Sequence, residues 1–164
     1  MLIENYASPL GEIIISAHDG AICGLWFAGQ KYEKRGIDES FAERPGDREV
    51  LEHCILWLDA YFSGAAPEIA FPLCPKGTAF QKKVWQELRL IPCGETATYG
   101  EIAERVGCKS ARAVGGAVGK NPISILIPCH RVLGANSTLT GYAGGIERKI
   151  FLLDLEKDKV PRHN

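Results

Sequence analysis

Three short runs of β-branched and aromatic residues open the chain, and turn residues separate them. The runs are Leu2–Tyr6, Glu12–Ser16 and Ala21–Phe27, with Ser8-Pro9-Leu10-Gly11 and His18-Asp19-Gly20 between them. Segments that favour strands and are joined by short glycine-containing turns are typical of neighbouring antiparallel strands. The pattern therefore predicts a small antiparallel meander at the start of the chain.

A helical spacing of apolar residues follows a polar stretch over residues 30–46, which we expect to be an exposed loop. From about Arg48 to Phe62 the apolar residues recur on one helical face, and Gly64 ends the pattern. The residues on this face are Leu51, Cys54, Ile55, Leu58 and Phe62. Ile69–Leu73 predicts one more strand, and Pro72–Gly77 predicts a linker.

The second half of the chain contains the start and stop signals of several short helices. Thr78 with Gln81 and Thr98 with Glu101 each fit a capping box, in which two side chains close the first turn of a helix. The first of these helices is predicted to place Phe80, Val84, Leu88 and Ile91 on its inner face. Gly107 is predicted to close the second, and Ser110 to cap a third from Ala111 to about Gly119. Two short helices joined by a tight turn predict a helix-turn-helix, although any small helical bundle contains such a corner.

The third predicted helix has almost no side-chain bulk. Its small residues are Ala111, Ala113, Gly115, Gly116, Ala117 and Gly119. Each glycine destabilises a helix by about 1 kcal/mol relative to alanine, so a close approach to the backbone is the natural reason for them. Either a neighbouring helix or an external partner could make that approach. Arg112, the one large charged residue here, is either a solvated arginine or a probe of a nucleic acid groove.

Charge is distributed unevenly along the chain, whose net charge is only −1. Residues 1–75 carry 5 Lys and Arg against 12 Asp and Glu, a net charge of −7. Residues 76–164 carry 14 against 8, a net charge of +6. The asymmetry favours a polyanionic partner for the second half, although two differently charged solvated surfaces would also account for it.

Composition and cysteine usage indicate an intracellular globular protein. Hydrophobic residues make up 46% of the chain, yet no apolar run approaches the roughly 18 residues of a membrane helix, and the start lacks a signal peptide pattern. We therefore expect a cytoplasmic protein with no membrane partner. The six cysteines form no C-x-x-C pair and are expected to be reduced. His18, Cys23 and His53-Cys54 lack zinc-finger spacing, so no metal is predicted.

Cys129 stands in surroundings that suit a nucleophile. Ile125-Leu126-Ile127 predicts a buried strand that Pro128 ends, and Cys129-His130-Arg131-Val132 follows directly. Basic neighbours favour the thiolate, which is the form of cysteine that attacks. Adjacent side chains of an extended chain point in opposite directions, so a Cys–His pair here requires a bound water or a local bend. From these residues alone, a buried structural cysteine remains an alternative.

The segment Ile127-Pro128-Cys129-His130-Arg131-Val132 resembles the active-site signature of the O6-alkylguanine-DNA alkyltransferases, also called methylated-DNA–protein-cysteine methyltransferases. Ala111–Ala117 resembles their DNA-binding helix, Asn121-Pro122 their asparagine hinge, and Thr140–Gly145 the loop over their pocket. The final predicted helix, Ile146–Lys157, carries the matching Glu156. The detailed resemblance covers about residues 76–157, and Ser8-Pro9-Leu10-Gly11 fits the family's N-terminal domain more loosely.

The resemblance implies an α+β fold in two parts. Residues 1–75 would form a small antiparallel sheet with a helix, similar to ribonuclease H. Residues 76–164 would form a helical alkyltransferase domain of the winged helix-turn-helix type that binds DNA.

The resemblance also implies a mechanism of DNA repair. Cys129 would take the alkyl group from O6-alkylguanine in a single, suicide transfer, and O4-alkylthymine stays open as a second substrate. His130 would accept the thiol proton through a bound water, Glu156 would hold His130, and Tyr99 would protonate guanine N3. No cofactor is implied, because the DNA itself supplies the alkyl group.

Contacts with DNA and with the flipped base complete the implied site. Arg112 would enter the duplex in place of the flipped nucleotide, with the small-residue helix in the minor groove. The expected DNA contacts are Thr98, Ala111, Ala113 and Gly115 besides Arg112, and the expected pocket and hinge residues are Asn121, Arg131, Val132, Tyr142 and Ala143. The partner would be double-stranded DNA bound by a monomer.

Two other functions remain to be weighed. Relatives that bind alkyl lesions without reacting lack the cysteine, so Cys129 argues against that function. A Cys-His hydrolase or transferase for small substrates would show turnover and would be indifferent to DNA.

Overall fold

The first part of the chain forms a three-stranded antiparallel sheet with one long helix. The computed structural model describes residues 1–34, 37–38 and 40–159. β1 (Leu2–Ser8), β2 (Gly11–His18) and β3 (Ala21–Phe27) pair in that order, so the predicted meander is confirmed. Asp19 and Gly20 both have positive φ, 51° and 74°, at the turn between β2 and β3. The predicted polar loop contains residues 35, 36 and 39, which lie outside the described residues.

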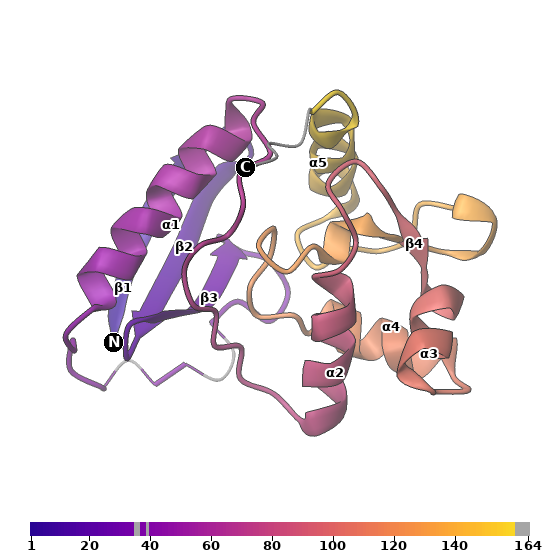
Figure 1. The fold of residues 1–164 in the computed structure, drawn as a ribbon, viewed down its shortest axis with the longest axis horizontal. Coiled ribbons are helices and arrows are strands. Elements are labelled where there is room, and N and C mark those ends of the chain that lie inside the picture. Colours follow the sequence, from indigo (N-terminus) through magenta and orange to yellow (C-terminus); the bar gives the residue numbers. More distant parts are fainter. Residues whose placement is uncertain (35–36, 39, 160–164) are drawn as a thin grey trace.

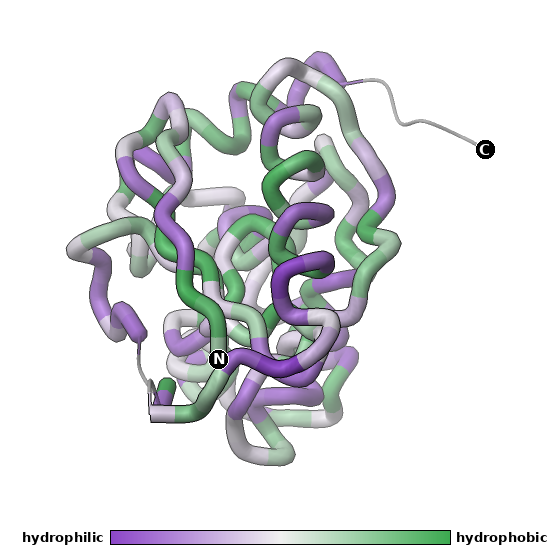
Figure 2. The backbone as a smooth tube through the Cα atoms, turned by 90° about the vertical axis from the view of Figure 1, so that its left-hand side faces the viewer, coloured by the Kyte–Doolittle hydropathy of each residue, from purple (hydrophilic) through white to green (hydrophobic). Residues whose placement is uncertain are grey.

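Helix α1 (Asp47–Phe62) packs along the sheet, as the apolar spacing predicted. Leu51, Cys54 and Leu58 on its inner face are 2%, 0% and 0% exposed. Figure 1 shows α1 lying beside β1 and β2, and in Figure 2 hydrophilic and hydrophobic stretches alternate along this helix. Burial of its apolar stripe against the sheet is thus what holds α1 in place.

The second part is a set of short helices. α2 (Ala79–Leu88) precedes β4 (Ala97–Thr98), α3 (Tyr99–Val106) and α4 (Ala111–Gly119), and α5 (Ile146–Lys157) ends the described helices. Both predicted capping boxes are present, at Thr78 and at Thr98. Gly107 ends α3 with φ 70°, a conformation that glycine adopts without strain, and Ser110 caps α4. α3 and α4 therefore form the predicted helix-turn-helix.

Two connections join the parts into one body. The edge of β3 pairs in parallel with Leu73 at Ile22 and with Ile123 at Leu25, so the segment that leads to Cys129 is tied to the sheet. β4 pairs in parallel with β5 (Val132–Leu133), which ties the start of α3 to the residues just after Cys129. The hydrophobic residues of both parts belong to one buried cluster.

Three local predictions are wrong. Ile69–Leu73 forms a single bridge instead of a strand, because Pro72 has no N–H to continue a ladder. Phe80 is 36% exposed, because it lies in the first turn of α2, beyond the part of the helix whose Val84 and Leu88 reach the core. Ile125–Ile127 is buried as predicted but forms a turn, in which Ile125 has φ 68°.

The predicted α+β class is confirmed by this succession of an antiparallel sheet with a helix and a helical second part. None of the helices within the described residues is long and apolar enough to cross a membrane.

Candidate active site

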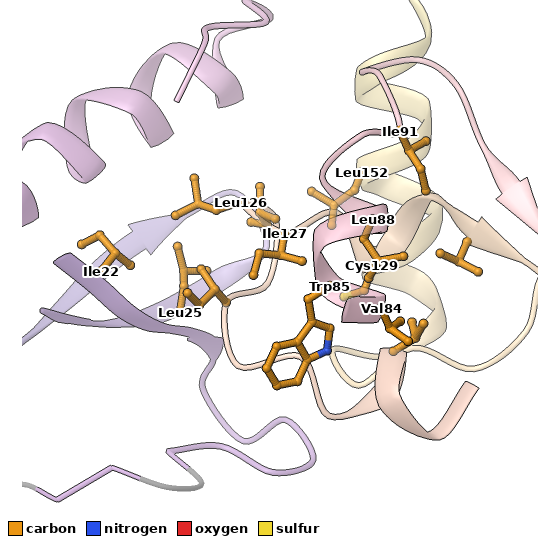
Figure 3. Packing of buried hydrophobic residues seen from close by; sticks show 14 of the residues in the cluster. Ile22, Leu25, Val84, Trp85, Leu88, Ile91, Leu126, Ile127, Cys129 and Leu152 are labelled. Atoms are coloured by element: carbon orange, nitrogen blue, oxygen red, sulfur yellow. The ribbon is translucent and has the colours of Figure 1, made fainter. Parts of the chain in front are cut away.

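Cys129 begins the short 3₁₀ helix η1 (Cys129–Arg131) and lies at the inner end of a pocket. The pocket has a volume of about 990 Å³, and its wall includes Tyr99, Arg112, Tyr142 and Ala143. Cys129 itself is 4% exposed, and Figure 3 shows it among the buried side chains that α2 contributes to the core. A pocket of this size holds a nucleobase, and Cys129 is the only cysteine among the described residues that line it.

Asn121 holds the turn that carries Cys129. Its side-chain nitrogen donates to the carbonyl of Ile127 at 2.8 Å, and its side-chain oxygen accepts from the amide of Ile123 at 3.0 Å. These bonds satisfy buried backbone groups that a strand would have paired in a ladder. They explain why the apolar run before Pro128 is a turn, and they connect the end of α4 to the nucleophile.

His130 points away from the pocket and toward α5. Its Nε2 lies 2.6 Å from Oε2 of Glu156, and both side chains are buried. The ionised carboxylate requires a donor, so Nε2 carries the proton and Nδ1 keeps the lone pair. Nδ1 is buried and has no hydrogen-bond partner among the described residues. His130 is therefore oriented as a base whose free nitrogen can receive a proton.

Glu156 is the most heavily bonded group of the site. Arg131 donates to it twice, from Nε to Oε1 at 2.7 Å and from Nη2 to Oε2 at 3.1 Å. The hydroxyl of Tyr61, on α1, donates to Oε2 at 2.5 Å. Burial alone would raise the pKa of Glu156, but the charges and hydrogen bonds of His130 and Arg131 hold it well below its ordinary value. Glu156 is consequently ionised at neutral pH.

The protonation of the two reacting groups follows from burial. Burial raises the pKa of Cys129 above its ordinary value, although Asn121, Lys149 and Tyr142 act in the opposite direction. Burial also lowers the pKa of His130, against the opposing effect of Glu156. The resting site therefore holds a neutral thiol and a neutral imidazole, which is the arrangement that a general-base mechanism needs.

The sequence reasoning missed Lys149 and Tyr61. Lys149 is fully buried on α5, and its Nζ donates to the carbonyl of Val132 at 2.6 Å. Burial lowers the pKa of Lys149, and the electrostatic effect of Cys129 acts in the opposite direction. The spacing of Lys149, Leu152 and Glu156 places all three on the inner face of α5. The available signal for Lys149 was a lysine at an inward position of a predicted helix, whereas no sequence pattern connected Tyr61 with the site.

The helix α4 and Tyr99 line the mouth of the pocket. Ala111, Arg112, Ala113 and Gly116 are exposed, and Arg112 makes no hydrogen bond or ion pair with any residue in the described part of the chain. A Cβ atom at Gly116 or Gly119 would meet nothing within 4 Å. Close packing inside the protein therefore does not explain these two glycines, and this surface of α4 is open to an external partner.

Tyr99 and Thr98 lie where β4 meets α3. The hydroxyl of Tyr99 accepts a hydrogen bond from Thr140 at 3.2 Å, and its ring lies 3.9 Å from the position of a Cβ on Gly115. The hydroxyl of Thr98 accepts from the amide of Glu101 as the helix cap, and Thr98 lines the pocket. A Cβ at Gly115 would therefore meet the Tyr99 ring only in ordinary van der Waals contact.

The predicted site residues divide into those that line the pocket and those that do not. Thr98, Tyr99, Ala111, Arg112, Gly115, Cys129, Tyr142 and Ala143 line it, whereas the exposed Ala113 and the residues Asn121, His130, Arg131, Val132 and Glu156 do not. Arg131 faces Glu156 and the carbonyl of Ile91, to which it donates at 2.7 Å. The Val132 carbonyl already accepts a hydrogen bond from the Lys149 ammonium, so a bound nucleobase could use only the second lone pair of this oxygen.

The residues considered for zinc have other contacts. The His18 ring stacks on Phe41 with centroids 5.1 Å apart, and Cys23 lies 3.2 Å from the hydroxyl of Ser16. Within residues 1–34, 37–38 and 40–159, no three His, Cys, Asp or Glu side chains are grouped to hold a metal ion.

A buried thiol, a His–Glu pair and a helix-turn-helix at the mouth of the pocket are together typical of a DNA-binding class of protein with a cysteine in its pocket. The family model for the 6-O-methylguanine DNA methyltransferase ribonuclease-like domain matches residues 1–75, and the model for the DNA-binding domain matches residues 79–158. The chain belongs to this family.

Relatives across bacteria and archaea support this assignment. A methylated-DNA–protein-cysteine methyltransferase of Mycobacterium leprae is 45% identical over 159 residues, which covers 93% of this chain and 90% of that protein. One from Methanosarcina acetivorans is 44% identical and covers 95% and 98%. The crystal structure of Mycobacterium tuberculosis OGT in complex with DNA is 42% identical, has a TM-score of 0.82, and covers 94% of this chain and 92% of that one.

Proposed function

We propose that this protein repairs alkylated DNA by moving the alkyl group from O6 of guanine to the sulfur of Cys129, once per molecule. The observation that carries the proposal is the position of Cys129. Cys129 lines a pocket whose mouth is α4 and Arg112, and the next residue along the chain, His130, is held by Glu156. The names of the relatives agree with this chemistry.

The transfer has a balanced course. The thiol proton passes through a water to Nδ1 of His130, and the sulfur electron pair attacks the alkyl carbon. The bond from that carbon to O6 breaks, its electron pair moves to O6 and the ring, and the Tyr99 hydroxyl protonates N3 of the departing guanine. His130 then releases a proton and Tyr99 regains one, so the thiol proton is in effect exchanged for the alkyl group. No residue of the proposed site removes the alkyl group from the thioether, so each molecule reacts once.

The guanine reaches Cys129 only if it leaves the duplex, because an in-line attack on O6 cannot take place inside the base stack. The open glycines of α4 let its backbone approach the minor groove, which is too narrow for a bulky helix. Arg112 then fills the space of the extruded nucleotide. Lys31 and Lys120 line the same pocket, and no carboxylate lines it among the described residues, which suits a polyanion. We infer that a monomer suffices.

A mass titration tests this function. The protein is mixed with increasing amounts of a duplex that contains one O6-methylguanine, and the intact protein is weighed. The expected result is one methyl group per molecule, on Cys129, with no further uptake. Continued turnover would favour a hydrolase, and tight binding without any mass increase would favour a lesion binder.

Arg112→Ala separates base extrusion from chemistry. We expect the second-order rate constant on duplex O6-methylguanine to fall about 100-fold. Extruding the base costs a few kcal/mol, and the variant has no side chain to fill the gap that the base leaves in the stack. The reaction with free O6-benzylguanine is expected to change less than about threefold, since nothing has to be extruded. Stopped or quenched time courses on both substrates measure this. Arg105→Ala, which removes an exposed arginine of α3 outside the pocket, is the control. Equal losses on both substrates would contradict the role given to Arg112.

A further inference from the structure

The ribonuclease-like part of the chain contributes a side chain to the catalytic centre of the second part. Tyr61 lies on α1 and is 1% exposed, and its hydroxyl donates to Oε2 of Glu156 at 2.5 Å, across 95 residues of sequence. The ring is fixed from two sides. Trp57 stacks on it with centroids 5.0 Å apart, and Nζ of Lys159 lies 3.2 Å from its centroid and donates to the Tyr61 carbonyl.

One oxygen of Glu156 thus serves two functions at once. Oε2 accepts from Nε2 of His130 at 2.6 Å, from the hydroxyl of Tyr61 at 2.5 Å and, at 3.1 Å, from Nη2 of Arg131, whose Nε donates to Oε1. Each hydrogen bond that Oε2 accepts from a group other than His130 reduces the negative charge available on this oxygen. The oxygen then attracts the imidazole proton of His130 less strongly. The phenol therefore competes with His130 for the same negative charge.

We propose that Tyr61 is a positioning residue of the alkyl transfer, which sets both the orientation of Glu156 and the basicity that Glu156 confers on His130. This inference rests on the proposed function. Tyr61 does not line the pocket. It acts on the reaction indirectly, because its hydroxyl binds Glu156 and Glu156 in turn holds His130.

The other titratable groups around Glu156 and His130 come from each element packed against them. Arg131 belongs to η1, Cys93 to the loop after α2, Lys149 to α5, and Lys159 to the segment after α5. The pKa of Lys159 is lowered to about 8 by burial, so its charge is lost in mildly alkaline solution. The acid side of the reaction's pH profile lies below that range and reports on His130, with Lys159 and Arg131 charged throughout.

Tyr61→Phe tests the role of the hydroxyl in the full-length protein. The measurement is the rate constant for free O6-benzylguanine between about pH 5 and pH 8, with alkylation followed by mass. Without the phenol, Glu156 is more basic and His130 holds its proton to a higher pH. The acid limb is expected to move up by about half a unit to one unit, and the plateau rate to fall about threefold to tenfold because Glu156 is less well oriented.

Tyr6→Phe is a matched control. Tyr6 lies in the same part of the chain, and its hydroxyl donates to Asp59 at 2.7 Å, so this variant also removes a phenol–carboxylate bond but leaves Glu156 untouched. Its profile is expected to superimpose on that of the unchanged protein. A profile of Tyr61→Phe that also superimposes, or an equal displacement in both variants, would overturn the proposal.

A second substitution guards against a loss of folding in Tyr61→Phe. Site-specific 3-fluorotyrosine at position 61 keeps the ring and the hydroxyl and makes the phenol a stronger donor, so the acid limb is expected to move to lower pH. No movement, or movement upward, would contradict the proposal even if Tyr61→Phe is unstable. The failure of the proposed function itself looks different, because the unchanged protein would then take up no alkyl group.

Discussion

Cys129→Ala is expected to abolish alkyl uptake completely, both from duplex DNA and from free O6-benzylguanine. The sulfur is the only atom that forms the new bond, and alanine leaves no nucleophile at the inner end of the pocket. Affinity for a duplex with O6-methylguanine is expected to stay within about threefold, because the cysteine contributes no charge to DNA binding. Intact-mass analysis and a binding titration in the same buffer measure the two effects.

Cys74→Ala is the matched control for this variant. Cys74 is exposed and lies outside the pocket, so its loss is expected to leave the single mass increase unchanged. Alkylation that persists in Cys129→Ala and disappears in Cys74→Ala would move the acceptor to another cysteine and contradict the assignment.

Glu156→Gln is expected to have the second largest effect, on both rate and stability. The amide cannot stabilise an imidazolium, so the rate constant for both substrates is expected to fall about 100-fold to 1,000-fold at neutral pH. Arg131 is also left without its anion in a site where Glu156 is 1% exposed, which lowers the free energy of unfolding by about 3–5 kcal/mol. Denaturant unfolding and time courses with free O6-benzylguanine measure these losses separately.

The pH dependence of stability gives an independent check on Glu156. Because its pKa is lower in the folded protein, its stabilising contribution is complete above the ordinary glutamate pKa of about 4.3 and is lost as the pH falls. The lowered pKa of His130 adds a loss of stability that begins below about pH 6.5, where the unfolded chain takes up a proton first.

Glu156→Gln is therefore expected to lack the part of the acid-induced loss that lies below about pH 4.3. Asp154→Asn, on the exposed side of the same helix, should keep the complete acid-induced loss. An unchanged acid limb in Glu156→Gln would show that another carboxylate carries it.

Local signals predicted most of the elements. The capping residues Thr78, Thr98 and Ser110 begin their helices as expected, and Gly107 ends α3, because each of these signals acts through hydrogen bonds within one helical turn. The prediction of a strand at Ile125–Ile127 is wrong for the opposite reason. An apolar run indicates that a segment is buried but does not specify its backbone conformation. Here the hydrogen bonds of the Asn121 side chain determine that conformation.

By itself, the sequence determined the starts of α2, α3 and α4 and the small-residue surface of α4, and it predicted a site of Cys129, His130 and Glu156 through a resemblance to a known family. Only the tertiary structure decided which groups surround Glu156 and Cys129. Tyr61 reaches Glu156 from α1, and Lys149 turns its ammonium group into the core beside Val132. Neither contact follows a spacing along the chain, because both depend on how separate elements pack, and a buried polar group becomes meaningful only when its partner is known.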